Sequence, residues 1–299
     1  MKIKANGIDI EVEDTGPGHA GAAPRPVVLL IMGRGMQLVA WPPAVVQALV
    51  DAGYRVLRFD NRDIGLSQHF DHLGTPNLLW ATLKFKIGLT VSAPYGLKDM
   101  AADAIGVLDA LGIAQAHVVG VSMGGMIAQR VALAAPQRVA SLTSIMSSSG
   151  ARGLPEAQPS VMRALFSRPA SSARDDIVAH YVKLYKAIGS PGYPIPEADM
   201  RSRILAGITR SFHPAGTMRQ MVAIAADGGR AAELARVARP TLVLHGHEDP
   251  LVPFPCGQDT ARRIPGAKLV GIEGMGHDLA PGVVGRLLPH MFPFLQAHA

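Results

Sequence analysis

One serine of this chain stands in a Gly-x-Ser-x-Gly pattern, which is typical of a nucleophilic serine held at a sharp turn between a strand and a helix. Ser122 is that serine, flanked by Gly120 and Gly124. The surrounding pattern predicts a buried strand over 117–121 and a helix over 123–135. A side chain at either glycine would keep strand and helix apart, so we expect the Ser122 hydroxyl to project over the positive end of the helix. The alternative is a capping serine in an ordinary strand-to-helix turn.

A serine hydroxyl needs a base to act as a nucleophile, and a histidine base needs a carboxylate to orient it. Asp249 follows a predicted strand at 240–245, and His277 follows the next predicted strand at 267–272. Serine, aspartate and histidine thus come in the order of a catalytic triad, each just after a strand end, where open α/β sheets bind their ligands. We predict these three residues to be catalytic.

Other titratable residues offer alternatives. Glu248 and Asp278 each adjoin a predicted triad member, and we expect a surface role for both. His69, Asp71 and His72 resemble a set of metal ligands. Metal sites usually show spaced cysteines or a helical His-x-x-x-His pair, which these residues lack, so we predict no metal site.

A glycine-containing loop, Gly33-Arg34-Gly35, follows a predicted strand at 27–32. It is not a dinucleotide-binding loop, because Leu38 stands where the third glycine would be. We predict instead that the backbone N–H groups of Arg34 and Met123 form an oxyanion hole. The Arg34 side chain faces either solvent or an acidic group of a substrate, and we expect the former.

The elements that would position these residues alternate along the chain. Asn6-Gly7 between two alternating stretches predicts an N-terminal hairpin. Further strands and helices then take turns, which predicts an α/β fold with a mostly parallel eight-stranded sheet flanked by helices. The predicted strands are 2–5, 8–13, 27–32, 54–60, 117–121, 139–145, 240–245 and 267–272, and the helices of this part are 42–52, 97–111, 123–135, 257–264 and 281–297.

The strand pattern is interrupted by a stretch with helical spacing and many prolines. We therefore predict two parts: an α/β core formed by residues 1–148 and 237–299, and an inserted helical cap, or lid, at 149–236. The prolines suggest that the cap moves. Its predicted lining is apolar, and we expect two or three of its members to touch a substrate: Met162, Phe166, Tyr181, Tyr185, Met200, Phe212, Met218 and Met221.

Composition excludes several classes of protein. With 48% apolar and 17% charged residues in 299, the chain is too hydrophobic to be disordered. Lys plus Arg exceed Asp plus Glu by 29 − 23 = 6, but no basic tract occurs, so we predict no nucleic-acid partner. No apolar run could span a membrane, and the single cysteine, Cys256, excludes an intrachain disulfide. We expect a soluble cytoplasmic protein with a buried, unreactive Cys256.

Several stretches together resemble the α/β-hydrolase superfamily over nearly the whole chain. Within it, the chain resembles the aclacinomycin methylesterase group, which is related to cofactor-free haloperoxidases and small carboxylesterases. The stretches that carry this resemblance are VLLIMGRGMQLVAW at 28–41, RFDNRDIGLS at 58–67, HVVGVSMGG at 117–125 and EGMGHDL at 273–279.

The resemblance implies the same triad and oxyanion hole, with no metal and no organic cofactor. It also implies a structural role for Asp60, Asp63 and Ser67. Many members have a small residue in place of Arg34, so the polyketide substrate of the group is not carried over.

Dehalogenases and epoxide hydrolases of this fold have aspartate at the nucleophile position, and Ser122 argues against both reactions. We expect a carboxylesterase that cleaves small or medium, largely apolar esters and exists as a monomer or homodimer. The alternatives are a cofactor-free perhydrolase or haloperoxidase with the same triad, and a non-catalytic ligand receptor.

Overall fold

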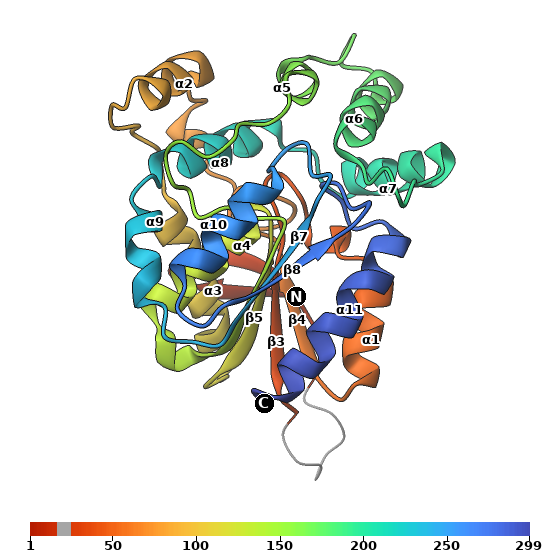
Figure 1. The fold of residues 1–299 in the computed structure, drawn as a ribbon. Coiled ribbons are helices and arrows are strands. Elements are labelled where there is room, and N and C mark those ends of the chain that lie inside the picture. The colour runs from red at the N-terminus through yellow and green to blue at the C-terminus, as the bar shows by residue number, and fades with distance from the viewer. Residues whose placement is uncertain (17–24) are drawn as a thin grey trace.

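The computed structural model describes residues 1–16 and 25–299. Its eight strands form one sheet (Figure 1). The strands are β1 (Lys2–Ala5), β2 (Ile8–Asp14), β3 (Val27–Ile31), β4 (Arg55–Phe59), β5 (Ala116–Val121), β6 (Val139–Ile145), β7 (Thr241–Gly246) and β8 (Lys268–Ile272).

The α-helices of the described residues include the five predicted for the α/β core and six others, five of them within the predicted cap. They are α1 (Pro43–Asp51), α2 (Leu78–Lys86), α3 (Leu97–Ala110), α4 (Met123–Ala134), α5 (Pro159–Phe166), α6 (Arg174–Ile188), α7 (Glu197–Arg210), α8 (Pro214–Ala226), α9 (Arg230–Glu233), α10 (Phe254–Arg263) and α11 (Pro281–Gln296). Helices α2, α5, α8 and α9 lie where the sequence pattern was too brief or too broken to predict a helix.

The strand order across the sheet is β1-β2-β4-β3-β5-β6-β7-β8. Strand β2 runs antiparallel to both neighbours, whereas all pairs from β4 to β8 are parallel. At the centre, Leu29 of β3 is in register with Leu57 of β4 and Val118 of β5, and all three are buried. The predicted mostly parallel α/β sheet is confirmed.

Helices cover both faces of the sheet. Helices α1 and α11 lie beside each other on one face, where Leu49 and Leu287 pack in a common cluster (Figure 1). On the other face α3 and α4 contribute Val107 and Ile127 to a second cluster. Strands buried on both sides read as continuous apolar runs, which explains why the pattern of the central strands was clear in the sequence.

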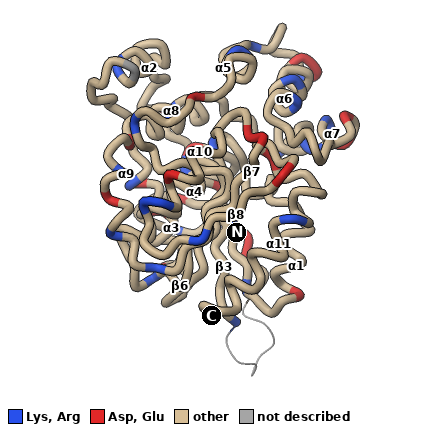
Figure 2. The backbone as a smooth tube through the Cα atoms, in the orientation of Figure 1, with Lys and Arg blue, Asp and Glu red and all other residues tan. Residues whose placement is uncertain are grey.

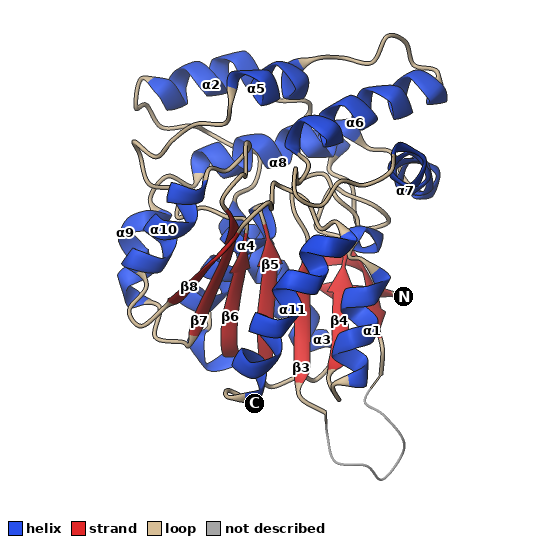
Figure 3. Cartoon of the chain, turned by 45° about the vertical axis from the view of Figure 1, so that its right-hand side comes forward, coloured by secondary structure: helices blue, strands red, loops and turns tan. Residues whose placement is uncertain are grey.

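Several helices lie across the ends of the strands. In Figure 3, α2, α5, α6 and α8 extend over the edge of the sheet toward which the parallel strands point. Helices α5 to α9 belong to residues 149–236, which we call the helical segment. Its last part also packs on the sheet side, since Leu234 belongs to the same apolar cluster as α3 and α4. The loops after β3, β5, β7 and β8 therefore open beneath these helices.

Basic and acidic positions both occur on helices α6, α7 and α9 in the view of Figure 2. This distribution agrees with the scattered charges of the sequence. Among the described residues, no helix combines the length and the apolar character that a membrane span requires.

Candidate active site

Ser122 lies at the junction of β5 and α4 in a backbone conformation that is rare for residues with a side chain. Its φ and ψ angles are 56° and −120°. The turn is held on both sides, because the Ser122 N–H donates to Ile145 O at 2.9 Å and the Ser147 hydroxyl donates to Ser122 O at 2.7 Å. Such strain persists only where neighbouring structure imposes it, and it is frequent at active sites.

The two glycines of the motif are required by close backbone approach. A Cβ atom at Gly120 would collide with the carbonyl oxygen of Gly124, and one at Gly124 would collide with the carbonyl oxygen of Ile31. The steric reason given for the motif from the sequence therefore holds. Larger residues here would push α4 away from β5 and β3.

The structure brings Ser122, Asp249 and His277 together although 127 residues separate the first two along the chain. The Nε2 atom of His277 lies 3.0 Å from the Ser122 hydroxyl oxygen. Its Nδ1 atom lies 2.7 Å from Oδ2 of Asp249. With Nδ1 donating to the carboxylate, Nε2 is left to accept the serine proton. This is the mutual geometry that a serine nucleophile requires.

Asp249 is fixed by the loop that follows β7. Its Oδ1 atom accepts the N–H groups of Leu251 at 2.9 Å and of Val252 at 2.8 Å. The side chain is fully buried, and its other oxygen faces His277. The neighbouring Glu248 is exposed and accepts the Gly274 N–H, as expected for a surface residue.

Asp278 does not have the surface role that we expected from the sequence. Its carboxylate accepts the Ser190 hydroxyl at 2.6 Å and the Ser190 N–H at 3.1 Å. The N–H of His277 itself donates to Ile188 O at 2.7 Å. The histidine loop is thus tied to the end of α6, a link between distant segments that no local pattern in the sequence could indicate.

Two backbone N–H groups beside Ser122 have no acceptor within the described part of the chain. They belong to Met123, the first residue of α4, and to Arg34 in the loop after β3. Gly33 brings this loop against the serine, since a Cβ on Gly33 would lie 3.2 Å from the Ser122 Cβ. Both predicted oxyanion donors therefore flank the nucleophile.

The side chain of Arg34 is not the solvent-facing cation that we expected. It is only partly exposed, and burial lowers the pKa of its guanidinium. The groups that act on its charge are the phenols of Tyr181 and Tyr185, both on α6. Tyr185 also donates its hydroxyl to the Met36 sulfur at 3.2 Å. The loop that carries Arg34 is therefore in contact with α6 of the helical segment.

Cys256 and His245 lie near the site but are buried. Burial raises the pKa of the Cys256 thiol to about 11, which favours the protonated thiol, and the expected burial of this cysteine is confirmed. His245 donates from Nε2 to Val252 O at 2.7 Å, and burial lowers its pKa. A neutral His245 supports the Asp249 loop without adding charge to it.

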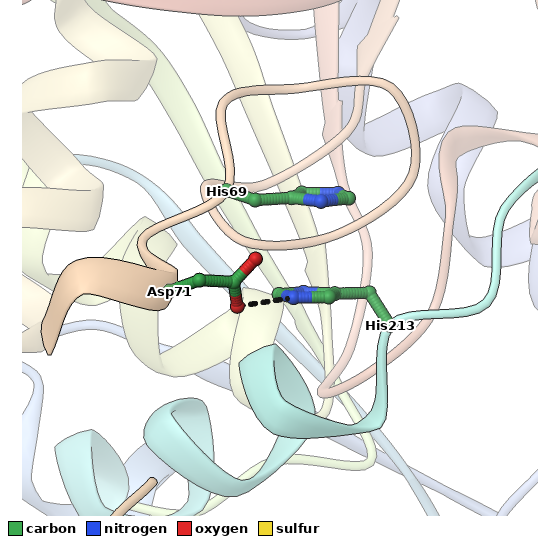
Figure 4. Close-up of side chains that lie close together, drawn as sticks. All are labelled: His69, Asp71 and His213. Atoms are coloured by element: carbon green, nitrogen blue, oxygen red, sulfur yellow. Dashed lines mark hydrogen bonds and ion pairs between the residues drawn. The ribbon is translucent and has the colours of Figure 1, made fainter. Parts of the chain in front are cut away.

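His69 and Asp71 meet a partner that the sequence did not indicate, His213, rather than His72 (Figure 4). The His213 ring lies 2.8 Å from Asp71 through Nε2, and the rings of His69 and His213 stack at 3.9 Å with an interplanar angle of 3°. Arg219 lies 3.2 Å from the same Asp71 oxygen. A cation would compete with this guanidinium, and parallel stacked rings do not point their nitrogens at a common centre. We assign the cluster a structural role.

The run at 58–67 is structural in the way the resemblance implied. Asp60 is buried and accepts the N–H groups of Leu38 at 2.7 Å and Leu66 at 2.9 Å, together with Arg210 of α7 at 2.7 Å. Ser67 donates its hydroxyl to Asp60 O at 2.6 Å. Through Asp60 and Arg210, this loop is therefore in contact with α7 of the helical segment.

The predicted apolar lining is only partly found over the site. Met200 is buried in a cluster between α6 and α7, and Phe166 and Phe212 are 45% and 41% exposed. Tyr181 and Tyr185 are the members that approach the Arg34 loop. Helical spacing alone did not indicate which face of each helix would point toward Ser122.

Comparisons with known proteins agree with this geometry. The sequence model of a family described as alpha/beta hydrolase fold matches residues 26–280. Rhodomycin D methylesterase DnrP of Streptomyces peucetius is 31% identical over 292 residues, covering 91% of this chain and 90% of the relative. A Mycobacterium tuberculosis protein described as non-heme bromoperoxidase BpoC is 27% identical, with 90% and 91% covered.

Solved structures share the whole architecture. A meta-cleavage product hydrolase from Pseudomonas fluorescens (CumD) superposes with a TM-score of 0.75 at 19% identity, covering 100% of this chain and 98% of the other. A thermophilic esterase from Thermogutta terrifontis gives 0.68 at 22% identity, with 100% and 99% covered.

Proposed function

Because the chain belongs to the alpha/beta hydrolase fold family, we propose that it is a carboxylesterase with Ser122 as its nucleophile. The observation that carries the proposal is the continuous hydrogen-bond chain from Ser122 through His277 to Asp249, at 3.0 and 2.7 Å. The methylesterase relative, at 31% identity over nearly the full chain, supports ester hydrolysis as the type of reaction.

In the first half of the proposed reaction, the Ser122 oxygen attacks the ester carbonyl while His277 Nε2 takes the serine proton. The N–H groups of Arg34 and Met123 stabilise the negative charge on the carbonyl oxygen. When the tetrahedral intermediate collapses, the C–O bond to the alcohol breaks and His277 returns the proton to the leaving alcohol. Ser122 then carries the acyl group as an ester.

In the second half, a water molecule gives a proton to His277 and attacks the acyl carbonyl. Collapse of the second tetrahedral intermediate breaks the bond to Ser122, which recovers its proton from His277, and the carboxylic acid is released. Asp249 keeps His277 in one tautomer and orientation throughout, because its other oxygen is fixed by two backbone N–H groups.

We further propose that the helical segment, 149–236, is the cap over this site. Two contacts support the idea: Ser190 binds the histidine loop through Asp278, and Gln220 of α8 accepts the Gly35 N–H at 2.8 Å. Tyr181 and Tyr185 of α6 approach the Arg34 loop from this segment, and their rings support our proposal of small or medium, largely apolar esters.

The proposal is tested with p-nitrophenyl esters from acetate to dodecanoate, comparing the wild-type chain with Ser122→Ala. We expect turnover that depends on Ser122 and is greatest at short or medium acyl lengths. Turnover no greater than that of the variant at every length would contradict esterase activity.

The bromoperoxidase relative favours one second candidate, the formation of a peracid from a carboxylic acid and hydrogen peroxide with the same residues. Peroxide would take the place of water as the second nucleophile. The peracid would oxidise added bromide to the brominating species. Serine-dependent bromination of monochlorodimedone in acetate buffer with hydrogen peroxide and bromide, faster than ester hydrolysis, would establish this reaction as the main one.

A further inference from the structure

Arg34 is partly exposed and has no carboxylate partner among residues 1–16 and 25–299, in contrast to the buried arginines of the same part of the chain. Four arginines are buried, and each forms an ion pair with an aspartate: Arg62–Asp103, Arg130–Asp227, Arg219–Asp63 and Arg230–Asp227. A buried guanidinium without an anion is energetically costly, which is why such pairs are the rule.

Among the described residues, the groups that act on the charge of Arg34 are phenols and not carboxylates. The groups that act electrostatically on its guanidinium are Tyr181 and Tyr185. Burial raises the pKa of both phenols, so they stay neutral and compensate the cation only weakly. The positive charge therefore remains available to a molecule that enters from the side of α6.

The backbone of Arg34 lies next to the nucleophile Ser122. Its N–H is a proposed oxyanion donor, and the preceding Gly33 approaches Ser122 to within 3.2 Å. The following Gly35 is held by Gln220, which limits rotation of the loop. Three methylene groups separate the Arg34 backbone from its guanidinium. A carboxylate bound by this guanidinium would therefore belong to the same substrate as the ester carbonyl and lie a few bonds from it.

We propose that Arg34 forms a carboxylate-binding subsite of the active site, so that the preferred substrates are esters that carry one free carboxylate a short distance from the scissile bond. A guanidinium binds a carboxylate through two parallel N–H···O hydrogen bonds. The rest of such a substrate would be largely apolar, as in the proposed esterase function.

This inference rests on the proposed esterase function and specifies its substrate class. The direct test compares monomethyl and dimethyl esters of succinate, glutarate and adipate, with acid release followed by pH-stat. The quantity of interest is the ratio of kcat/KM for the monomethyl ester to kcat/KM for the dimethyl ester. Arg34→Met keeps the backbone N–H and an unbranched stem but removes the charge.

For at least one chain length, we expect Arg34→Met to lower this ratio by about 10- to 100-fold, the size of effect expected for a charge-assisted hydrogen-bonded pair. The loss should lie mainly in KM, and Arg34→Lys should recover part of it. Arg203→Met on α7 is the matched control, because Arg203 is exposed and its removal changes the net charge equally. The ratio should not change in this variant.

A second measurement separates failure of the subsite from failure of the esterase proposal. Binding of glutarate to Ser122→Ala, followed by calorimetry, needs no turnover and should weaken by a similar factor when Arg34→Met is added. An unchanged ratio in Arg34→Met would overturn the subsite even if Ser122-dependent hydrolysis is found. If no ester is hydrolysed, equal glutarate affinity of Ser122→Ala with and without Arg34→Met would also overturn the subsite.

Discussion

The guanidinium of Arg219 binds both carboxylate oxygens of Asp63, at 2.6 and 2.8 Å, and both side chains are buried. Arg219 lies on α8, in the helical segment, and Asp63 lies in the loop after β4, in the core. Asp63 has a φ angle of 72°, so its loop holds a strained conformation to present the carboxylate. This ion pair joins the helical segment to the α/β core.

The first prediction concerns this pair. Arg219 and other hydrogen-bond donors outweigh the effect of burial and lower the pKa of Asp63. A lowered pKa in the folded state means stabilisation that is present above the unfolded value and lost as the pH falls. Asp63→Asn should lower the free energy of unfolding at pH 7 by about 3–5 kcal/mol, and its difference from the wild type should shrink below pH 4.

Urea unfolding at pH 7 and pH 3 measures the difference in the free energy of unfolding between Asp63→Asn and the wild type. The exposed pair of Glu197 with Lys186 provides the comparison, since Glu197→Gln should cost much less than Asp63→Asn. Equal costs for the two variants at pH 7 would show that the buried pair does not anchor α8.

The second prediction concerns His117 in β5. Burial lowers the pKa of this histidine to about 4, and its Nε2 atom has no partner. Below pH 7 the unfolded chain therefore binds a proton at His117 that the folded chain does not bind. The free energy of unfolding should decrease as the pH falls from 7 toward 4. The loss from this one group is about 2 kcal/mol between pH 7.5 and pH 5.

In His117→Gln, unfolding free energy measured across this pH range should decline less steeply than in the wild type. The exposed His290→Gln is the control and should keep the wild-type slope. Parallel slopes in all three proteins would contradict a neutral, buried His117.

The third prediction separates adjacent carboxylates. Asp249→Asn should reduce kcat by about 10⁴-fold, because the amide stabilises the wrong tautomer of His277. Glu248→Gln, one residue away and exposed, should change kcat far less. If Glu248→Gln lowered kcat more than Asp249→Asn in an ester assay, the assignment of Asp249 as the carboxylate that orients His277 would be wrong.

The fourth prediction concerns the single thiol. Because burial raises the pKa of Cys256 to about 11, thiolate is scarce at pH 8. Ellman's reagent should therefore react very slowly with the native protein and should titrate one thiol in 6 M guanidinium chloride. Rapid reaction in the folded state, monitored at 412 nm, would show that the residue is accessible.

The fifth prediction limits where the proposed cap can move. Helix α8 is held by the Arg219–Asp63 pair and by Gln220, which donates to Arg62 O at 3.0 Å. Helix α5 begins at the prolines that suggested a mobile lid, and it has one buried residue, Val161. Hydrogen exchange should be slow in α8, like the core, and faster in α5. Equal protection of the two helices would argue against a lid that opens at α5.

Local patterns in the sequence were sufficient for the α/β fold and for the residues around the nucleophile. Central strands of a parallel sheet are apolar along their whole length, and the elbow needs glycine on both sides of Ser122. Strand ends then indicated Asp249 and His277, because loops at one edge of a parallel sheet lie close together. These features depend on short stretches of chain and on the topology that short connections allow.

Tertiary packing alone decided the contacts made by the helical segment. Asp278 holds the histidine loop through Ser190, 88 residues away, and His213 rather than His72 completes the cluster with His69. Arg34 was expected in solvent, but α6 packs over it. Each of these contacts depends on where the helices after β6 return to the sheet, and that is set by the packing of side chains distant in sequence.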